Sequence, residues 1–166
     1  VKQAWLQSRE SYGQTEAFRF AGGPIDDEDG PEGLLNAWPL DESHIDYVDG
    51  DATSGIVNND TDYPTLTFDV LEPLNEAPED NDISIGYHAV EFLVWGQDSD
   101  EPSAFTTGMR QYTDYTSAAN ATRRGEYLKV CGQGIVDLLQ DMKDEWDPAQ
   151  SGNYRETLLA SDVDEA

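Results

Sequence analysis

Two residues with the chemistry to bind a metal, His88 and Glu91, lie in the most apolar stretch of the sequence, "IGYHAVEFLVWGQD" at residues 85 to 98. Because they are three residues apart, a helix places them on one face. A neutral imidazole beside carboxylates suits a divalent or ferric ion. A buried, ionised Glu91 needs a cation, an arginine or a proton. Two interpretations follow: a metal or ligand site, and a buried His–Glu–Arg network, with Arg19 or Arg110 as a distant arginine, that only fixes packing.

Further side chains are candidates for lining a site around His88. Trp95 and Asp98 continue the stripe of His88 and Glu91 if the helix extends past Gly96. Arg19, in "EAFRF", has the guanidinium geometry to bind a carboxylate through two hydrogen bonds. A tryptophan in this sequence is expected either to pack in the core or to form the wall of a pocket. An acidic residue in so acidic a chain is expected to be solvated by default, and the alternative is that it provides an oxygen ligand. The remaining candidates of these two kinds are Trp38, Asp41, Glu42 and Asp46.

Several enzyme classes lack their motifs in this sequence. A catalytic zinc site normally uses three protein ligands and a general base. HExxH is absent, and the inverted motif fails because Phe92 stands where it requires histidine. His44 is the only second imidazole, and nothing in the sequence brings it near His88. GxSxG, P-loop and dinucleotide-binding motifs are also absent, and the acidic loops lack calcium-loop spacing. Classical zinc proteolysis is therefore disfavoured, although a metallopeptidase stays open as an alternative.

The charge of the chain is strongly negative, with 35 acids, 9 bases and a formal net charge of −26 in 166 residues. Such a surface repels nucleic acids and anionic membranes, so neither is expected as a partner. Dense carboxylates are typical of proteins from salty environments, which indicates a marine or halophilic source. The single cysteine, Cys131, excludes an internal disulfide, and no apolar run is long enough to span a membrane.

The hydrophobic pattern predicts an all-α protein, an irregular up-down helical bundle with long polar loops. Helices are expected over residues 1 to 20, 86 to 96, 115 to 146 and 153 to 161, with short helical pieces between 33 and 48. Asp114 or Thr116 is expected to cap the longest helix. Residues 49 to 82 are expected to be irregular or helical, and "SDVDEA" to be frayed. We expect one domain over residues 1 to 166. Because the chain begins within a helical pattern, we expect this domain to be truncated at both ends.

The segment "GYHAVEFLVWGQD" resembles the GxHxxE signature of the imelysin family, also called the M75 peptidase-like or iron-regulated protein A group. Three other segments resemble family segments in the same order: "SYGQTEAFRFAGGPID", "GPEGLLNAWPLDESHIDYV" and "TDYTSAANATRRGEYL". The resemblance runs from about residue 3 to about residue 140. It implies an all-α fold of two related bundles, export to the bacterial periplasm or cell surface, often as a lipoprotein, and a link to iron supply.

The resemblance also implies a site near the interface of the two bundles. On this sequence the motif residues are Gly86, His88 and Glu91, which makes iron, another divalent metal or an iron compound the expected ligand. The chain matches the first bundle of longer family members, so a second bundle or a homodimer is an expected partner. An interaction module with a purely structural His–Glu network is a further alternative. Site-lining candidates that match family-like segments are Arg19, Trp38, Asp41, Asp46 and Asp98.

Overall fold

The computed structural model describes residues 1–98 and 107–161. Within these ranges it contains helices and no β-strand beyond one isolated bridge, Val48 to Asp51, so the predicted all-α class is confirmed. None of the described helices has the length and apolarity needed to cross a membrane. The order of elements is α1 (Lys2–Gly13), η1 (Gln14–Phe18), α2 (Glu32–Asn36), α3 (Glu42–Ile45), η2 (Ile56–Asn58), α4 (Phe68–Leu71), η3 (Glu72–Leu74), α5 (Gly86–Trp95), η4 (Tyr112–Tyr115), α6 (Ala121–Trp146) and α7 (Tyr154–Ala160).

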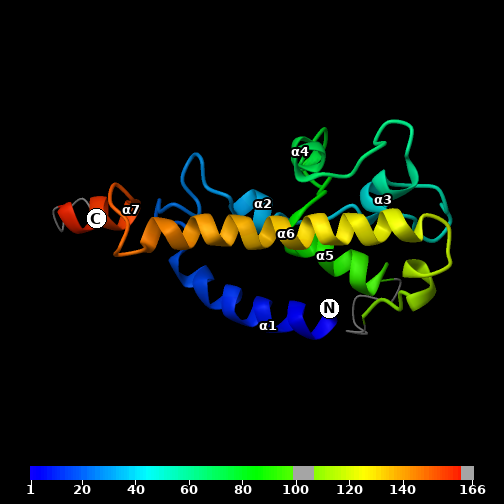
Figure 1. Ribbon diagram of the computed structural model, residues 1–166, viewed down its shortest axis with the longest axis horizontal. Coiled ribbons are helices and arrows are strands. Elements are labelled where there is room, and N and C mark those ends of the chain that lie inside the picture. The colour runs from blue at the N-terminus through cyan, green and yellow to red at the C-terminus, as the bar shows by residue number, and fades with distance from the viewer. Residues whose placement is uncertain (99–106, 162–166) are drawn as a thin grey trace.

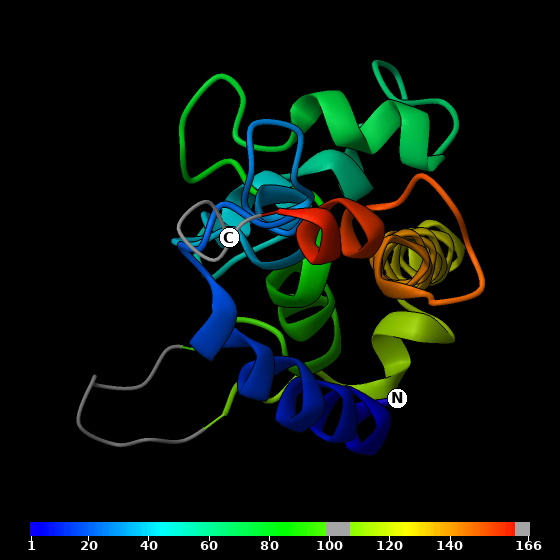
Figure 2. The same ribbon diagram turned by 90° about the vertical axis from the view of Figure 1, so that its left-hand side faces the viewer.

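Helix α6 runs along the long axis of the molecule, and α5 packs against it in the opposite direction (Figure 1). Viewed end-on in Figure 2, α5 lies near the centre, with α1, α6 and the short α2–α4 segments around it. Seven of the ten α5 residues are buried, so this helix forms the middle of the core. The core residues around it include Leu35, Ile45, Leu71, Tyr127 and Cys131. An apolar helix surrounded on most sides is the arrangement that its sequence predicts.

Helix α1 packs on α5 through one stripe of large side chains. The Trp5 indole Nε1 donates to the carbonyl of Tyr87 at 2.9 Å, and the Trp5 ring meets the Trp95 ring edge-on at 5.2 Å between centroids. About two helical turns after Trp5, Tyr12 lies against Tyr87, with ring centroids 5.0 Å apart. The contacts of Trp5 with Trp95 and of Tyr12 with Tyr87 show that α1 and α5 are antiparallel. This packing fixes the position of Trp5 beside the last turn of α5.

Two of the predicted helices each have one boundary in the wrong place. The first helix ends at Gly13 and continues as the 3₁₀ helix η1, because glycine favours helix poorly and the Thr15 hydroxyl donates to the Tyr12 carbonyl at 2.6 Å. The long helix begins at Ala121 after Asn120, whose backbone is left-handed. Asp114 does not cap it, because its carboxylate is bound in a buried network described below.

The other predicted elements match the structure closely. Helix α5 matches the expected range to within one residue and ends at Trp95, before Gly96, whose φ of +75° suits glycine. Residues 49 to 82 form only one short α-helix and two 3₁₀ turns, and α7 lies within the expected 153 to 161. Residues 99–106, part of the segment between the helices expected over 86 to 96 and 115 to 146, and residues 162–166 of the acidic end lie outside the described residues.

Candidate functional site

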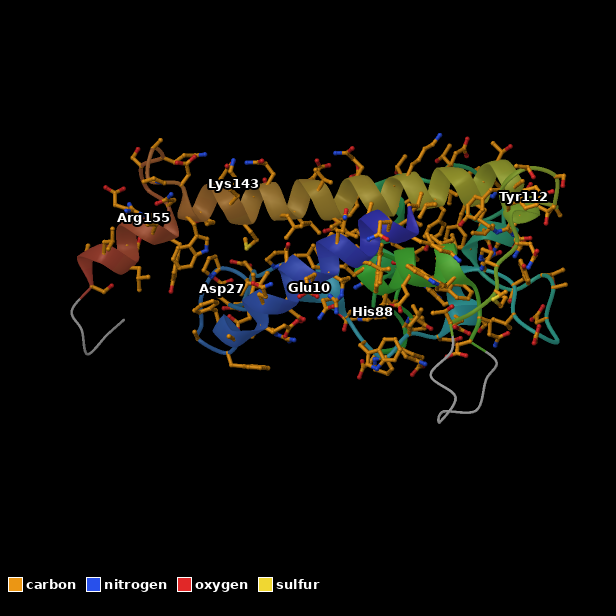
Figure 3. The ribbon with its side chains drawn as sticks, turned by 90° about the horizontal axis from the view of Figure 1, so that it is seen from below. Glu10, Asp27, His88, Tyr112, Lys143 and Arg155 are labelled. Atoms are coloured by element: carbon orange, nitrogen blue, oxygen red, sulfur yellow. The ribbon has the colours of Figure 1, made fainter. Side chains whose placement is uncertain are left out.

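A pocket of about 1000 Å³ lies over the exposed stripe of α5. Its walls come from α1, from the segment around α3, from α5 and from residues 107 and 108 after it. Figure 3 shows His88 on the side of α5 that faces away from α6. The pocket therefore opens on the face of α5 that the core leaves uncovered. Its lining includes Trp5, Leu6, Trp38, Leu40, Asp41, Glu42, Ser43, Asn81, His88, Glu91, Phe92, Trp95, Gln97 and Asp98.

Helix α5 presents only three partly exposed residues, and these three form the stripe that lines the pocket. His88, Glu91 and Trp95 follow one another at three and four residues, and every other residue of the helix is buried. The close approach of Gly86 to α2 explains how the helix starts so deep in the core. Gly86 has φ of +84°, and a Cβ on it would lie 2.7 Å from the carbonyl oxygens of Leu34 and Leu35. Only glycine fits this close approach.

His88 and Glu91 contact each other directly, as their spacing predicts. His88 Nδ1 lies 3.0 Å from Glu91 Oε2, and the two side chains are 17% and 44% exposed. The expectation that Glu91 is buried is therefore wrong, and water already stabilises its charge. When Nδ1 of His88 carries the ring proton, this contact orients the imidazole and leaves Nε2 with a lone pair for a ligand.

Trp38 covers the imidazole of His88. The two ring centroids are 4.8 Å apart at an interplanar angle of 54°, and Trp38 remains 68% exposed. The expectation of Trp38 as a core residue therefore fails, and the alternative expectation, a pocket wall, matches its place. The exposed ring of such a large aromatic side chain offers apolar surface that a bound ligand can bury. Trp95 has the mixed role of packing on Trp5 and lining the pocket.

Carboxylates surround the pocket. Asp41 caps α3, because its Oδ1 accepts hydrogen bonds from the backbone and hydroxyl of Ser43 at 2.9 and 2.7 Å. Glu42 Oε1 accepts from the backbone of Asp98 at 3.4 Å. Burial raises the pKa of the Glu42 carboxyl, and the charges of Asp98 and Asp41 raise it further. With Glu91, these groups make the described lining negative, and no Lys or Arg belongs to it.

Arg19 does not reach this pocket. Its Nη1 lies 2.9 Å from Glu32 Oε1 and 3.6 Å from Glu16 Oε2, beyond the far end of α1. It therefore binds carboxylates, as its side chain predicts, but not Glu91. Gly86 also lies outside the lining and acts by positioning α5. The second histidine, His44, lies 3.7 Å from Asp82 Oδ1 beside a smaller hollow, and burial lowers its pKa.

Asp46 lies outside the pocket, in a buried ionic network. Arg124 binds it through two hydrogen bonds, Nε to Oδ2 at 2.5 Å and Nη2 to Oδ1 at 3.0 Å. Arg110 Nη1 lies 2.8 Å from the same Oδ2 and 3.3 Å from Asp114 Oδ2, and the Tyr47 hydroxyl donates to Asp114 at 2.7 Å. The expected buried His–Glu–Arg network around His88 and Glu91 is therefore not present among the described residues; Arg110 instead joins a separate network whose acids are Asp46 and Asp114. It ties α3, η4 and α6 together behind the pocket.

Some members of these sites were missed in the sequence. Nothing in the sequence marks Trp5 as a pocket residue, because its contact with Trp95 depends on how α1 packs. Arg124 lies on the core side of α6, where an arginine among Tyr127 and Cys131 is itself a signal of a buried carboxylate partner. No local pattern identifies that partner as Asp46, far away in the sequence.

The donor set of the pocket suits iron or a similar metal in type but supplies few protein ligands. An imidazole and a carboxylate meet at His88 and Glu91. Across residues 1–98 and 107–161, no three His, Cys, Asp or Glu side chains group closely enough to hold a metal ion together. A metal at this pocket would therefore have at most two protein ligands from this pair, His88 and Glu91, among the described residues.

Comparison with known families agrees with the motif in α5. A family model described as imelysin, peptidase M75, matches residues 1–166. No curated protein matches the chain in sequence. The family match extends over the pocket walls, the buried network and the helices that hold them.

Proposed function

The chain belongs to the imelysin family, and we propose that it is an exported binding protein of iron uptake that holds iron, another metal or an iron compound in the pocket over α5. The observation that carries this proposal is the pair of His88 Nδ1 and Glu91 Oε2, 3.0 Å apart on the one face of α5 that the core leaves open. A buried structural pair has no need of a pocket, whereas this one lies in its wall.

The surroundings of the pair support binding of a positively charged ligand. Asp41, Glu42 and Asp98 line the same pocket as Glu91. The buried network around Asp46 and Arg124 holds α3 and α6 together behind this wall, so it is a rigid support for the carboxylates. Export to the bacterial periplasm or cell surface is part of the proposal, and the resemblance of the sequence to imelysins supports it.

Binding is favoured over hydrolysis by the number of protein ligands. A catalytic zinc site uses three protein ligands and keeps a water in the fourth position. His88 and Glu91 supply two, and the nearest alternative imidazole, His44, lines a different hollow. The protein groups at the pocket can hold and orient a ligand, but a peptidase needs a further ligand and a separate base.

The proposal is tested by measuring iron retained after gel filtration, with ⁵⁷Fe supplied as ferrous salt, ferric citrate and the tris(phenanthroline) complex. We expect about one iron per chain in at least one of these forms, and a strong loss in His88→Ala. His44→Ala is the matched control, because it removes the other imidazole away from the pocket. Circular dichroism verifies the helical content of each variant. Equal retention in His88→Ala and wild type, or no retention in any form, contradicts the proposal.

A further inference from the structure

The pocket is large for a bare metal ion. Its volume of about 1000 Å³ equals that of sites that enclose drug-sized organic ligands, at roughly 300–1,000 Å³. A bare ion bound there would have only His88 and Glu91 as protein ligands among the described residues, and water would have to supply the rest of its coordination sphere. Size and donor number therefore favour a ligand with a molecular body of its own.

The sign of the ligand's charge follows from the described lining. It contains four carboxylates, those of Asp41, Glu42, Glu91 and Asp98, and neither a lysine nor an arginine. Charges of one sign in a concave, partly apolar site reinforce each other, because the walls screen them poorly. An anionic ligand would meet this field, which no lysine or arginine of the described lining offsets, whereas a cation relieves the repulsion among the acids.

The apolar part of the lining is aromatic. Trp38 covers His88, and Trp5 meets Trp95 edge-on, so the pocket lining contains three indole rings. Indole faces attract cations more strongly than other aromatic side chains do. One cation is already placed in this way, since Lys2 Nζ lies 5.2 Å from the centroid of the Trp95 ring. The rings also offer flat apolar surface to a ligand with faces of its own.

We infer that the pocket binds a bulky cation with apolar faces, recognised by the indole rings of Trp5, Trp38 and Trp95 and by the carboxylates around them. The inference rests on the proposed function, under which this cation is a chelate that carries the iron. In that form the chelator supplies most of the metal's ligands, which agrees with the small number of converging protein donors.

The test uses equilibrium dialysis with four probes at low and high salt. Tris(phenanthroline)iron(II) is a bulky cation, and the tris complex of iron(II) with disulfonated bathophenanthroline is an anion with the same metal core. Ferrous sulfate supplies the bare ion, and tetraphenylphosphonium is a bulky cation without metal. We expect one saturable site per chain for the two bulky cations, weakened by salt because the attraction is partly ionic. We expect no such site for the anion or for bare iron.

Two variants separate the pocket from the general acidity of the surface. Trp38→Ala should weaken binding of the bulky cations roughly tenfold, and Glu91→Gln should weaken it severalfold. The matched controls are Trp146→Ala, an exposed tryptophan at the far end of α6, and Glu10→Gln on the outer side of α1. Both controls should bind as wild type does. If the controls weaken binding as much as the pocket variants, the attraction belongs to the whole surface and the inference is overturned.

The probes also distinguish this inference from the function beneath it. One bare iron per chain, insensitive to Trp38→Ala, would overturn the bulky-cation inference and leave iron binding intact. Equal affinity for the anionic and cationic complexes would overturn it as well. Tetraphenylphosphonium binding without the iron chelate would support the ligand class and remove support from the iron assignment. Failure of all four probes would contradict the bulky-cation inference, and failure of ferric citrate as well would contradict the proposed function.

Discussion

The indole of Trp38 lies against the imidazole of His88, with ring centroids 4.8 Å apart, although the two side chains come from different segments of the chain. Trp38 precedes α3, and His88 belongs to α5. The contact joins the segment that carries Asp41 and Glu42 to the stripe that carries Glu91. The elements of the pocket therefore meet at this pair of rings.

Two tryptophans of the pocket should differ sharply in their contribution to stability. Trp38→Ala should change the free energy of unfolding by no more than about 1 kcal/mol, because most of the ring is in water. Trp5→Ala should cost about 3 kcal/mol, because it removes a ring packed on Tyr87 and Trp95 and a hydrogen bond to the Tyr87 carbonyl. Urea unfolding of both variants measures the difference. Equal losses would mean that Trp38 is a structural residue and not an open wall.

Gly86 should not tolerate a side chain. In Gly86→Ala the new Cβ meets the carbonyls of Leu34 and Leu35 at 2.7 Å and the backbone keeps a φ of +84°, so we expect a loss of at least about 2 kcal/mol in the free energy of unfolding. Gly132→Ala is the control, because nothing lies within 4 Å of its added Cβ in the middle of α6. That variant should gain up to about 1 kcal/mol. The prediction fails if both variants shift stability in the same direction.

The buried network should be costly to break from one side. Arg124→Met leaves the buried carboxylate of Asp46 with Arg110 and the side-chain amide of Asn58 as partners, and we expect a loss of about 3–5 kcal/mol. Lys129→Met, an exposed position on the same helix, should stay within about 0.5 kcal/mol of wild type. Chemical denaturation of the two proteins provides the comparison. A loss below about 1 kcal/mol in Arg124→Met would show that water or another cation reaches Asp46.

The carboxyl of Glu42 should make stability depend on pH. Its folded pKa is raised, first by burial and then by the charge of Asp98, so the folded state keeps the proton to a higher pH than the unfolded state does. This contribution to stability is complete below the unfolded glutamate pKa of about 4.3 and is lost as pH rises through the folded pKa. Glu42→Gln removes the ionisation and keeps an acceptor for the backbone of Asp98.

We therefore expect Glu42→Gln to be more stable than wild type near neutral pH, with the advantage disappearing in acid. Thermal melts at several pH values and low salt measure this, with Glu10→Gln on the exposed side of α1 as control. A Glu42→Gln variant that is less stable than wild type at neutral pH would contradict the assigned cause, since it would mean that the ionised carboxylate stabilises the fold.

The sequence predicts α5 and the contact of His88 with Glu91 because both depend on local spacing. An apolar helix with one polar stripe must turn that stripe away from the core, and residues three apart share a face. The start of α6 was predicted too early because Asp114 reads as a cap, whereas its carboxylate is held by Arg110 and Tyr47. That competition involves distant segments and leaves no local pattern.

The predicted site residues also fall into two groups, those that line the pocket and those that distant partners hold elsewhere. Trp38, Asp41, Trp95 and Asp98 line the same pocket as His88, although Asp98 does so from the segment after α5 and not as a continuation of its helical stripe. Asp46 and Arg19 lie elsewhere, each held by a partner of opposite charge that tertiary packing supplies. In a chain with 35 acids, the type of a residue does not tell which carboxylates face a pocket and which face a buried arginine. Only the packing of α3 and α6 decides it.

Anomalous diffraction at the iron edge, from crystals loaded with iron in the form that the protein retains best, tests the central claim most directly. The account predicts one strong anomalous peak per chain inside the pocket, beside the side chains of His88 and Glu91, and no such peak in crystals of His88→Ala. A peak among the acidic loops, or at the hollow beside His44, would contradict it by showing that iron binds this chain outside the pocket over α5.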